Sequence, residues 1–297
     1  MHNVRCAVLL AAYNGEKYIK EQISSILTQK SVHVDIYVSD DGSLDNTVDI
    51  IKSIGSDNIY ILDYCEGLRS ASKNFFRLLR DVDLSSYEYV CFSDQDDIWK
   101  SDKIASAINI IIEKGVNAVS SNVYAFWQDG KTELINKCYR QQKYDYIFES
   151  AGPGCTYMFD KKIAAEFSEF IRRNWSKLCE IELHDWLIYL WARSNEYKWW
   201  IDAIPTVYYR QHDNNVFGAR SSLKSIVLRW EKLSGCWYRS QILKMTDLLG
   251  LDHLIPVRLI RRLNYADRIM LAFSVHNYRR RFCDRIVLSM AFFLMRK

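Results

Sequence analysis

Proline and glycine are scarce in this chain of 297 residues, which has only 3 and 11 of them. Collagen-like and low-complexity proteins need far more of both, so these classes are excluded. Charged residues make up 26% of the chain and hydrophobic residues 49%, which is typical of a folded globular protein and not of a disordered one. At roughly 150 residues per domain, this length predicts about two domains.

Long apolar runs are also missing. The run 286–295 near the end of the chain is well short of the roughly 18 residues that a membrane-spanning helix needs. The run 6–12 follows Arg5, but it is at the short limit for a secretory signal and no small-x-small cleavage pattern follows it. We therefore interpret residues 4–12 as a buried first strand.

The eight cysteines form no C-x-x-C pair and show no metal-ligand spacing. In a chain of this size such scattered cysteines favour reduced thiols in a cytosolic protein over a disulfide framework. The glycine-rich motifs G-x-G-x-x-G and G-x-x-x-x-G-K-[ST] are absent too, which argues against a nicotinamide dehydrogenase and a P-loop enzyme. Any nucleotide diphosphate must then be held by a metal ion and basic side chains.

The net charge of +4 hides two regions of opposite sign. Residues 220–297 hold 16 Lys and Arg against 5 Asp and Glu, a net charge of +11, which leaves residues 1–219 with −7. We expect different roles for the two regions.

Apolar periodicity alternates between strand-like and helix-like segments in the first part of the chain. The predicted strands are 4–12, 32–39, 59–62 and 87–93, and the predicted helical segments between them are 19–29, 47–54 and 75–79. This order predicts an α/β fold with an open, mainly parallel sheet and helices on both faces. Beyond residue 223, long basic helical patterns predict a helical C-terminal region. We place the boundary between 1–219 and 220–297.

Three polar loops follow predicted strands, at residues 13–15, 40–43 and 94–97. Ligands of such sheets bind at the carboxyl ends of the strands, so we expect these loops to meet in one crevice. Asp94 and Asp96, two apart on one loop, could hold a hard divalent cation with positions left open for phosphate oxygens, or they could merely cap the next helix. Asp41 could accept from the imide N–H of uracil or thymine, or serve only in a turn and helix cap.

Taken together, these loops resemble the family 2 glycosyltransferases of the GT-A fold. The matching segments are Ala-Ala-Tyr-Asn-Gly at 11–15, Asp-Asp-Gly-Ser-x-Asp-x-Thr at 40–47, Lys-Asn-Phe at 73–75 and Asp-x-Asp-Asp-Ile-Trp at 94–99. Segments 93–99, 152–156, 184–186 and 209–215 are similar to bacterial rhamnosyltransferase-type enzymes of surface polysaccharide assembly.

The resemblance implies roles for individual residues, which cover the donor, the metal and the acceptor. The implied donor-binding residues are Ala11, Tyr13, Glu16, Asp41, Lys73 and Asp94, with Asp96 as principal ligand of Mg²⁺ or Mn²⁺ and Asp94 and His212 as further ligands. The implied catalytic base is Asp185, and the acceptor-side residues are Gly152, Gly154, His184 and Trp186.

Several of these residues have alternative interpretations. Asp185 could simply cap a helix, His212 could be a solvated histidine, and residues 152–154 could form a plain turn. The family commonly has Glu-Asp where this chain has His184 and Asp185, so the role of His184 stays open. If Asp185 is the base, one carboxylate and one metal suffice for a single displacement with inversion, unlike glycoside hydrolysis with its two carboxylates.

The basic region 220–297 combines arginines with tryptophan and phenylalanine. An Arg cluster followed by an apolar segment is typical of a helix at an anionic membrane surface. A helical subdomain that packs on the first domain would also explain this combination of basic and aromatic residues. Nucleic-acid binding explains it less well, so we expect no nucleic-acid partner.

The expected function is transfer of a sugar, L-rhamnose from dTDP-rhamnose, to a lipid-linked saccharide in bacterial O-antigen or capsule synthesis. The enzyme would be cytoplasmic and peripheral at the inner face of the cell membrane. The alternatives are a UDP-hexose donor, a sugar-nucleotide nucleotidyltransferase, and a non-catalytic binding protein.

Overall fold

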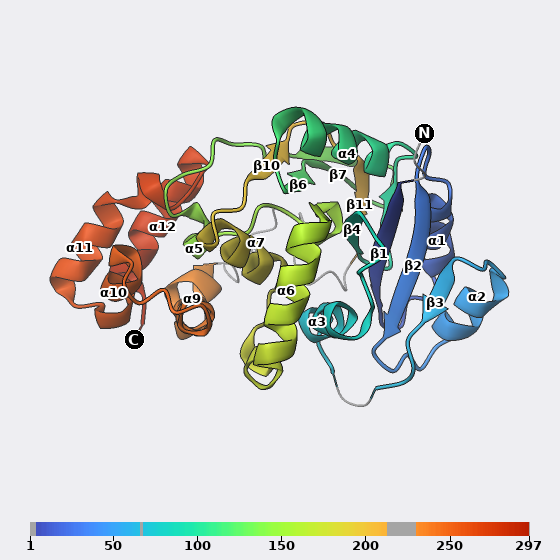
Figure 1. Ribbon diagram of the computed structural model, residues 1–297. Helices are drawn as coiled ribbons and strands as arrows, with labels where there is room; N and C mark the ends of the chain where they lie inside the picture. The colour runs from blue at the N-terminus through green and yellow to red at the C-terminus, as the bar shows by residue number, and fades with distance from the viewer. Residues whose placement is uncertain (1–3, 66–67, 213–229, 297) are drawn as a thin grey trace.

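The computed structural model describes residues 4–65, 68–212 and 230–296 (Figure 1). The strands are β1 (Arg5–Ala12), β2 (His33–Asp40), β3 (Ile59–Ile61), β4 (Tyr89–Ser93), β5 (Ile98–Trp99), β6 (Ala118–Ser121), β7 (Val123–Phe126), β8 (Thr132–Ile135), β9 (Met158–Asp160), β10 (Trp199–Asp202) and β11 (Val207–Arg210). The α-helices are α1 (Ile19–Leu27), α2 (Thr47–Ser53), α3 (Ala71–Asp81), α4 (Lys103–Lys114), α5 (Asp145–Phe148), α6 (Lys161–Asn174), α7 (His184–Ser194), α9 (Cys236–Leu248), α10 (Ile255–Arg262), α11 (Tyr265–Phe273) and α12 (Phe282–Leu294). Three 3₁₀ turns complete them, η1 (Gly154–Thr156), η2 (Trp175–Glu180) and η3 (Val275–Asn277).

The central sheet has seven strands in the order β10-β6-β9-β4-β1-β2-β3. Neighbouring strands of this sheet are parallel, except that β9 runs antiparallel to both β4 and β6. The predicted open, mainly parallel sheet is therefore confirmed, and its four predicted strands lie within one or two residues of β1, β2, β3 and β4. The antiparallel β9 was not predicted.

Alternate side chains of β1 enter two separate cores, as the two-residue period of a strand requires. Ala7 and Leu9 belong to a core shared with α3, α6 and α7, and Val8 and Leu10 belong to one shared with α1 and α4. Helices therefore cover both faces of the sheet (Figure 1).

A second sheet of four strands, in the order β5-β11-β7-β8, lies beside the first. β5 follows the acidic loop 94–97 directly, and β11 pairs with it through Tyr208 and Ile98. The segment after β11 is thereby brought back to the acidic loop.

The C-terminal helices α9–α12 form the end of the molecule farthest from β3 (Figure 1). Their buried residues Tyr238, Ile242 and Met245 belong to the same core as the α3–α6–α7 face of the sheet. The expected boundary at residue 219 lies outside the described residues and stays a prediction. None of the described helices combines the length and the apolarity needed to cross a membrane.

Many arginines of this basic region bond inside the protein, which the charge count did not predict. Arg268 donates to the carbonyl oxygens of Phe292 and Met295 at the end of α12, at 2.7 and 2.8 Å. Arg239 donates to Ile260 O at 2.9 Å, and buried Arg280 pairs with Asp145 at 3.3 Å. The basic surface is thus smaller than the net charge of +11 implies.

Candidate active site

The loops after β1 and β4 are joined through the side-chain amide of Gln95. Its Oε1 accepts from Tyr13 N and its Nε2 donates to Tyr13 O, both at 2.8 Å. A Cβ on Gly15 would lie 2.3 Å from the same Oε1, so a larger residue there would push the Gln95 amide away from Tyr13. The backbone of the first loop is therefore fixed, while the Tyr13 ring is half exposed.

Of the residues predicted to bind the donor, Ala11, Tyr13 and Asp41 lie at the carboxyl ends of β1 and β2. Ala11 lies opposite Ser39 in the parallel register. The Asp41 carboxylate accepts from the backbone N–H groups of Arg69 and Ser70 at 3.1 and 3.0 Å, just before α3 begins. Within its own loop the turn is closed by Asp40, whose Oδ2 accepts from Gly42 N and Ser43 N at 3.1 and 2.8 Å, so the turn and cap role suggested for Asp41 is not what the structure shows. A base-binding role for Asp41 stays a prediction.

Glu16 and Lys73 flank this edge. Glu16 Oε2 accepts from the backbone and side-chain nitrogens of Asn46 at 3.1 and 3.0 Å, so Glu16 holds the start of α2. Lys73 is partly buried on the first turn of α3. It follows shortly after Arg69 and Ser70, whose backbone N–H groups donate to Asp41.

Asp96 and His212 are brought together from distant parts of the chain. His212 Nε2 lies 2.6 Å from Asp96 Oδ2, and the His212 ring stacks on Tyr18 with 5.4 Å between ring centroids. Arg210 fixes the acidic loop from the same side: its N donates to Asp97 Oδ1 at 3.1 Å and its Nε to Asp96 O at 2.8 Å. Arg210 also pairs with Glu21 on α1.

A second set of possible ligand atoms lies deeper. One ligand atom each from Asp94, Asp97 and Cys155 lie within 4.8 Å of one another, and buried Asp97 Oδ2 has no hydrogen-bond partner among the described residues. Burial and the carboxylates of Asp97 and Asp94 raise the pKa of the Cys155 thiol, so this sulfur stays protonated and is a poor ligand for a hard cation. The carboxylates fit Mg²⁺ or Mn²⁺, which prefer oxygen ligands.

Burial and the neighbouring carboxylates both shift the pKa of Asp94 upward. Burial, with the charges of Asp96 and Asp185, raises it to about 7. Burial and the same loop neighbours also raise the pKa of Asp97. Uncompensated negative charge at one point is what a divalent cation relieves, so the donor set fits a metal.

Asp185 lies on the first turn of α7, and its charge is one of the causes that raise the pKa of Asp94. Burial raises its pKa to about 6, against a hydrogen bond from Trp186 N at 2.8 Å and the influence of Ser150 and Lys137, which lower it. A carboxyl with this pKa is a carboxylate near neutral pH and basic enough to accept a proton.

His184, next to Asp185, is a neutral ring packed among aromatics. It stacks on Phe75 with a centroid distance of 3.9 Å and meets Phe92 edge-on at 5.5 Å. Burial lowers its pKa to about 3. Its Nε2 is buried and has no hydrogen-bond partner in the part of the chain that the structure describes. It lies 2.7 Å from where a Cβ on Gly154 would be, so His184 and Gly154 are in contact.

The other two acceptor-side residues differ from one another. Gly152 has φ +147 and lies against the Lys137 side chain, in the loop that faces Asp185. Trp186 is buried, donates its indole N–H to Tyr146 O at 3.0 Å and stacks on Tyr238 of α9. Trp186 therefore packs inside the protein, and an acceptor-side role for it stays a prediction.

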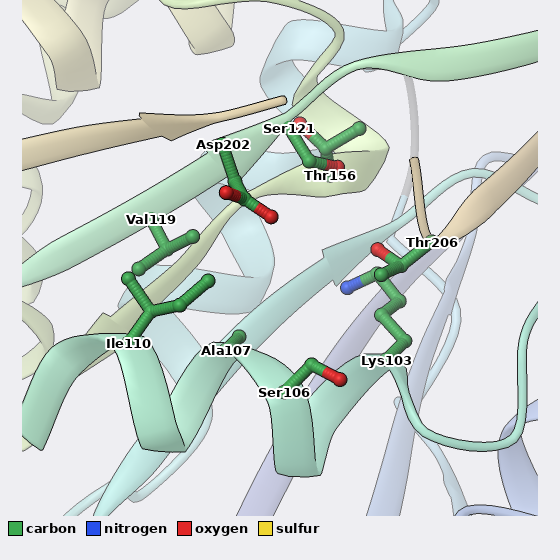
Figure 2. Close-up of a pocket in the computed structure, with 9 residues that line it drawn as sticks. All are labelled: Lys103, Ser106, Ala107, Ile110, Val119, Ser121, Thr156, Asp202 and Thr206. Atoms are coloured by element: carbon green, nitrogen blue, oxygen red, sulfur yellow. The ribbon is translucent and has the colours of Figure 1, made fainter. Parts of the chain in front are cut away.

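A small pocket lies between α4 and the sheet (Figure 2). Its volume of about 10 Å³ is roughly what one water molecule needs. The side chains of Lys103 and Asp202 point into it (Figure 2). It is too small for a sugar nucleotide, so the site described above remains the candidate.

Sequence reasoning missed several residues that build this site. Gln95 stands between two expected ligands, and Arg210 stands two residues before His212, so their positions carried a signal. Ser150 and Lys137 carried none, because only the folded chain brings them to Asp185.

Comparison with known proteins identifies the family. The family model described as glycosyl transferase family 2 matches residues 7–167. The dTDP-rhamnosyl transferase RfbG of Shigella flexneri is 41% identical over 288 residues, which are 96% of this chain and 99% of that protein. The UDP-Glc:alpha-D-GlcNAc-diphosphoundecaprenol beta-1,3-glucosyltransferase WfgD of Escherichia coli is 25% identical over 173 residues, 57% of this chain and 65% of that protein.

Solved structures confirm the fold. S. aureus TarS 1–349 in complex with UDP-GlcNAc has a TM-score of 0.54 at 13% identity, covering 93% of this chain and 82% of that one. The mannosyltransferase PcManGT of Pyrobaculum calidifontis, in complex with GDP-Man and Mn²⁺, has a TM-score of 0.55 at 15% identity, covering 99% and 86%. The fold is the expected GT-A type with C-terminal helices. The chain therefore belongs to glycosyl transferase family 2 and is a glycosyltransferase like the bacterial rhamnosyltransferases.

Proposed function

We propose that this enzyme transfers L-rhamnose from dTDP-L-rhamnose to a lipid-linked saccharide, with inversion, in the assembly of a bacterial surface polysaccharide such as O-antigen or capsule. The observation that supports dTDP-L-rhamnose as the donor is the 41% identity to a dTDP-rhamnosyl transferase over nearly the full length of both chains. Since that identity extends beyond the sheet to the C-terminal helices, it covers the whole proposed site.

The donor would lie across the carboxyl ends of β1, β2 and β4. Ala11, Tyr13 and Asp41 would frame the thymine ring, with Glu16 and Lys73 at the flanks. Asp94 would reach the ribose or the metal. Asp96, with Asp94 and His212, would hold Mg²⁺ or Mn²⁺, and such a cation, when bound, neutralises charge on a leaving diphosphate.

Asp185 would act as the base. In an inverting displacement the acceptor hydroxyl attacks the anomeric carbon opposite the diphosphate and must lose its proton as it does so. Asp185 is separated in sequence from the acidic loop but interacts with Asp94 at the end of β4. It would accept the proton at a carboxylate oxygen, while the neutral ring of His184 and the small Gly154 shape the acceptor side.

One face of α12 provides the evidence for the proposed lipid-linked acceptor and membrane surface. Phe282, Ile286, Met290 and Phe293 recur at intervals of four, four and three residues and are all exposed, so they form one apolar stripe. The α12 stripe, defined by these four residues, is accompanied by exposed Phe273 and Met270 of α11, which packs on α12.

Exposed cations accompany the α12 stripe. Arg281 directly precedes it, and Arg258 and Arg296 are exposed on the same group of helices. An apolar face with basic residues nearby fits an anionic membrane surface. The name of WfgD describes a diphosphoundecaprenol-linked acceptor for that relative, and such a substrate would be met at the membrane. The enzyme would then be cytoplasmic and peripheral at the inner face of the membrane.

A UDP-hexose donor is the second candidate, because WfgD is named for UDP-Glc and TarS was solved with UDP-GlcNAc. A donor screen separates the two. The protein is incubated with dTDP-rhamnose, UDP-glucose or UDP-GlcNAc plus Mn²⁺ or Mg²⁺, and release of nucleoside diphosphate is measured. Preferential hydrolysis of dTDP-rhamnose supports the proposal, and preference for a UDP-sugar favours the second candidate.

A further inference from the structure

The C-terminal region reaches into the candidate active site through Arg280. Its side chain is only 2% exposed, although it comes from the turn between η3 and α12. Its Nη2 donates to Ser150 O at 2.5 Å and its backbone N to Glu149 Oε1 at 2.8 Å. Arg280 thus binds two consecutive residues of the loop that follows α5.

The same guanidinium also reaches the helix that carries Asp185. Arg280 Nη1 lies 3.3 Å from Asp145 Oδ2 and 3.4 Å from the hydroxyl of Tyr189, which donates to Asp145 at 3.0 Å. Tyr189 follows Asp185 by four residues, one turn along α7. Arg280 therefore connects the loop beside Asp185 with the helix that carries Asp185.

Neighbouring contacts fix the loop further. Arg279 pairs with Glu149 at 3.4 Å, Tyr238 of α9 donates to Phe148 O at 2.5 Å, and Tyr157 donates to Gly152 O at 3.1 Å. The Ser150 hydroxyl donates to Gly152 O at 3.2 Å. A Cβ on Gly154, in the same loop, would lie 3.4 Å from Asp185 Cβ, so the loop that is held in this way lies against Asp185. Buried and charge-assisted contacts of this kind orient a side chain more tightly than a solvated loop can.

We propose that Arg280 is a positioning residue for the transfer reaction: by holding Ser150 and α7 together, it sets the orientation of the Asp185 carboxylate. The C-terminal helices would then complete the active site, besides any contact they make with a membrane. The proposal rests on the function proposed above, in which Asp185 is the base.

The test compares variants of the full-length enzyme for transfer or donor hydrolysis. The set is Arg280→Met, Arg280→Lys, Ser150→Ala, Ser150→Thr and Asp185→Asn, with Arg261→Met as a control. Arg261 bonds to Asp247 and Asp252 on the exposed side of the same helical region. Rates are divided by the number of sites that bind dTDP with Mn²⁺, measured by calorimetry, so that loss of folded protein does not lower the value.

We expect a fall in kcat with the donor KM unchanged. Misplacing a reacting group by about 1 Å can cost on the order of 100-fold, so Arg280→Met should lose roughly 10- to 100-fold in kcat per binding site and Arg280→Lys should recover part of it. Ser150→Ala should lose about 5-fold, the equivalent of one hydrogen bond of about 1 kcal/mol, and Ser150→Thr should retain most activity. Arg261→Met should match the wild type.

The outcomes that overturn the positioning role differ from the one that overturns the proposed base. If Asp185→Asn is inactive but both Arg280→Met and Ser150→Ala keep the wild-type kcat per binding site, the positioning role is wrong. The same holds if Arg280→Met only lowers the number of binding sites and Ser150→Ala has no effect. If Asp185→Asn itself keeps wild-type activity, it is the proposed base that fails.

Discussion

His212 Nε2 lies 2.6 Å from Asp96 Oδ2, although 116 residues separate the two along the chain. The contact exists because β11 returns to pair with β5, which begins directly after the acidic loop. The histidine and the carboxylate that the sequence predicted as metal ligands are therefore neighbours, with Arg210 bonded to the loop beside them.

Asp96→Asn and His212→Ala should weaken Mn²⁺ binding in the presence of dTDP. The loss of a ligand or of its hydrogen-bonded partner typically costs about 10- to 100-fold in metal affinity, and calorimetry of Mn²⁺ binding measures it directly. Asp49→Asn, an exposed carboxylate on α2, is the control. Unchanged Mn²⁺ affinity in both site variants would rule out the proposed ligand set.

Activity should fall on acidification through pH 6. Burial raises the pKa of Asp185 to about 6, so below this pH the carboxyl is protonated and cannot accept a proton from the acceptor. Since the pKa of Asp94 is raised to about 7, metal binding also weakens in acid, and the profile of kcat must be measured at saturating Mn²⁺ at each pH. A rate that stays constant from pH 5 to 8 would contradict the role of Asp185.

Gly154→Ala should destabilise the protein through a clash with His184. The new Cβ would lie 2.7 Å from His184 Nε2, and overpacking of this kind typically costs about 1 to 3 kcal/mol. The double variant Gly154→Ala with His184→Ala removes the clash, so its loss of thermal stability should be smaller than the sum of the two single losses. Additive losses in melting temperature would show that the two residues do not interact.

Binding to anionic vesicles should depend on the α12 stripe. The combined change of Phe282, Ile286 and Met290 to Ser removes three exposed apolar side chains and should reduce co-sedimentation with phosphatidylglycerol vesicles several-fold. Ile112→Ser, an exposed residue on α4, is the control for general loss of surface apolarity. Equal sedimentation of the triple variant and the wild type would count against membrane docking by this face.

The sheet could be predicted because its strands are short buried runs that end in polar loops. β1, β2 and β4 were recognisable in this way, and the parallel arrangement then placed residues 13–15, 40–43 and 94–97 at one edge. β9 was not, because three residues, Met158–Asp160, carry too little periodicity to identify a strand.

Charge counting was less informative about the C-terminal region. Arg268, Arg279 and Arg280 look like surface cations in the sequence, but they bond to helix ends and to Glu149 and Asp145. Their buried partners lie more than 20 residues away for Arg268 and more than 100 for the other two. Such pairing depends on tertiary contacts that no local pattern encodes.

The rate of donor hydrolysis by the wild type and by Asp185→Asn shows whether the enzyme uses dTDP-L-rhamnose and whether Asp185 is its base. With Mn²⁺ present, the wild type should consume dTDP-L-rhamnose with a kcat/KM well above that for UDP-glucose. Removal of a general base typically costs about 10²- to 10⁴-fold, so Asp185→Asn should lose this much while still binding dTDP. Preference for a UDP-sugar, or full activity of the Asn variant, would contradict the account.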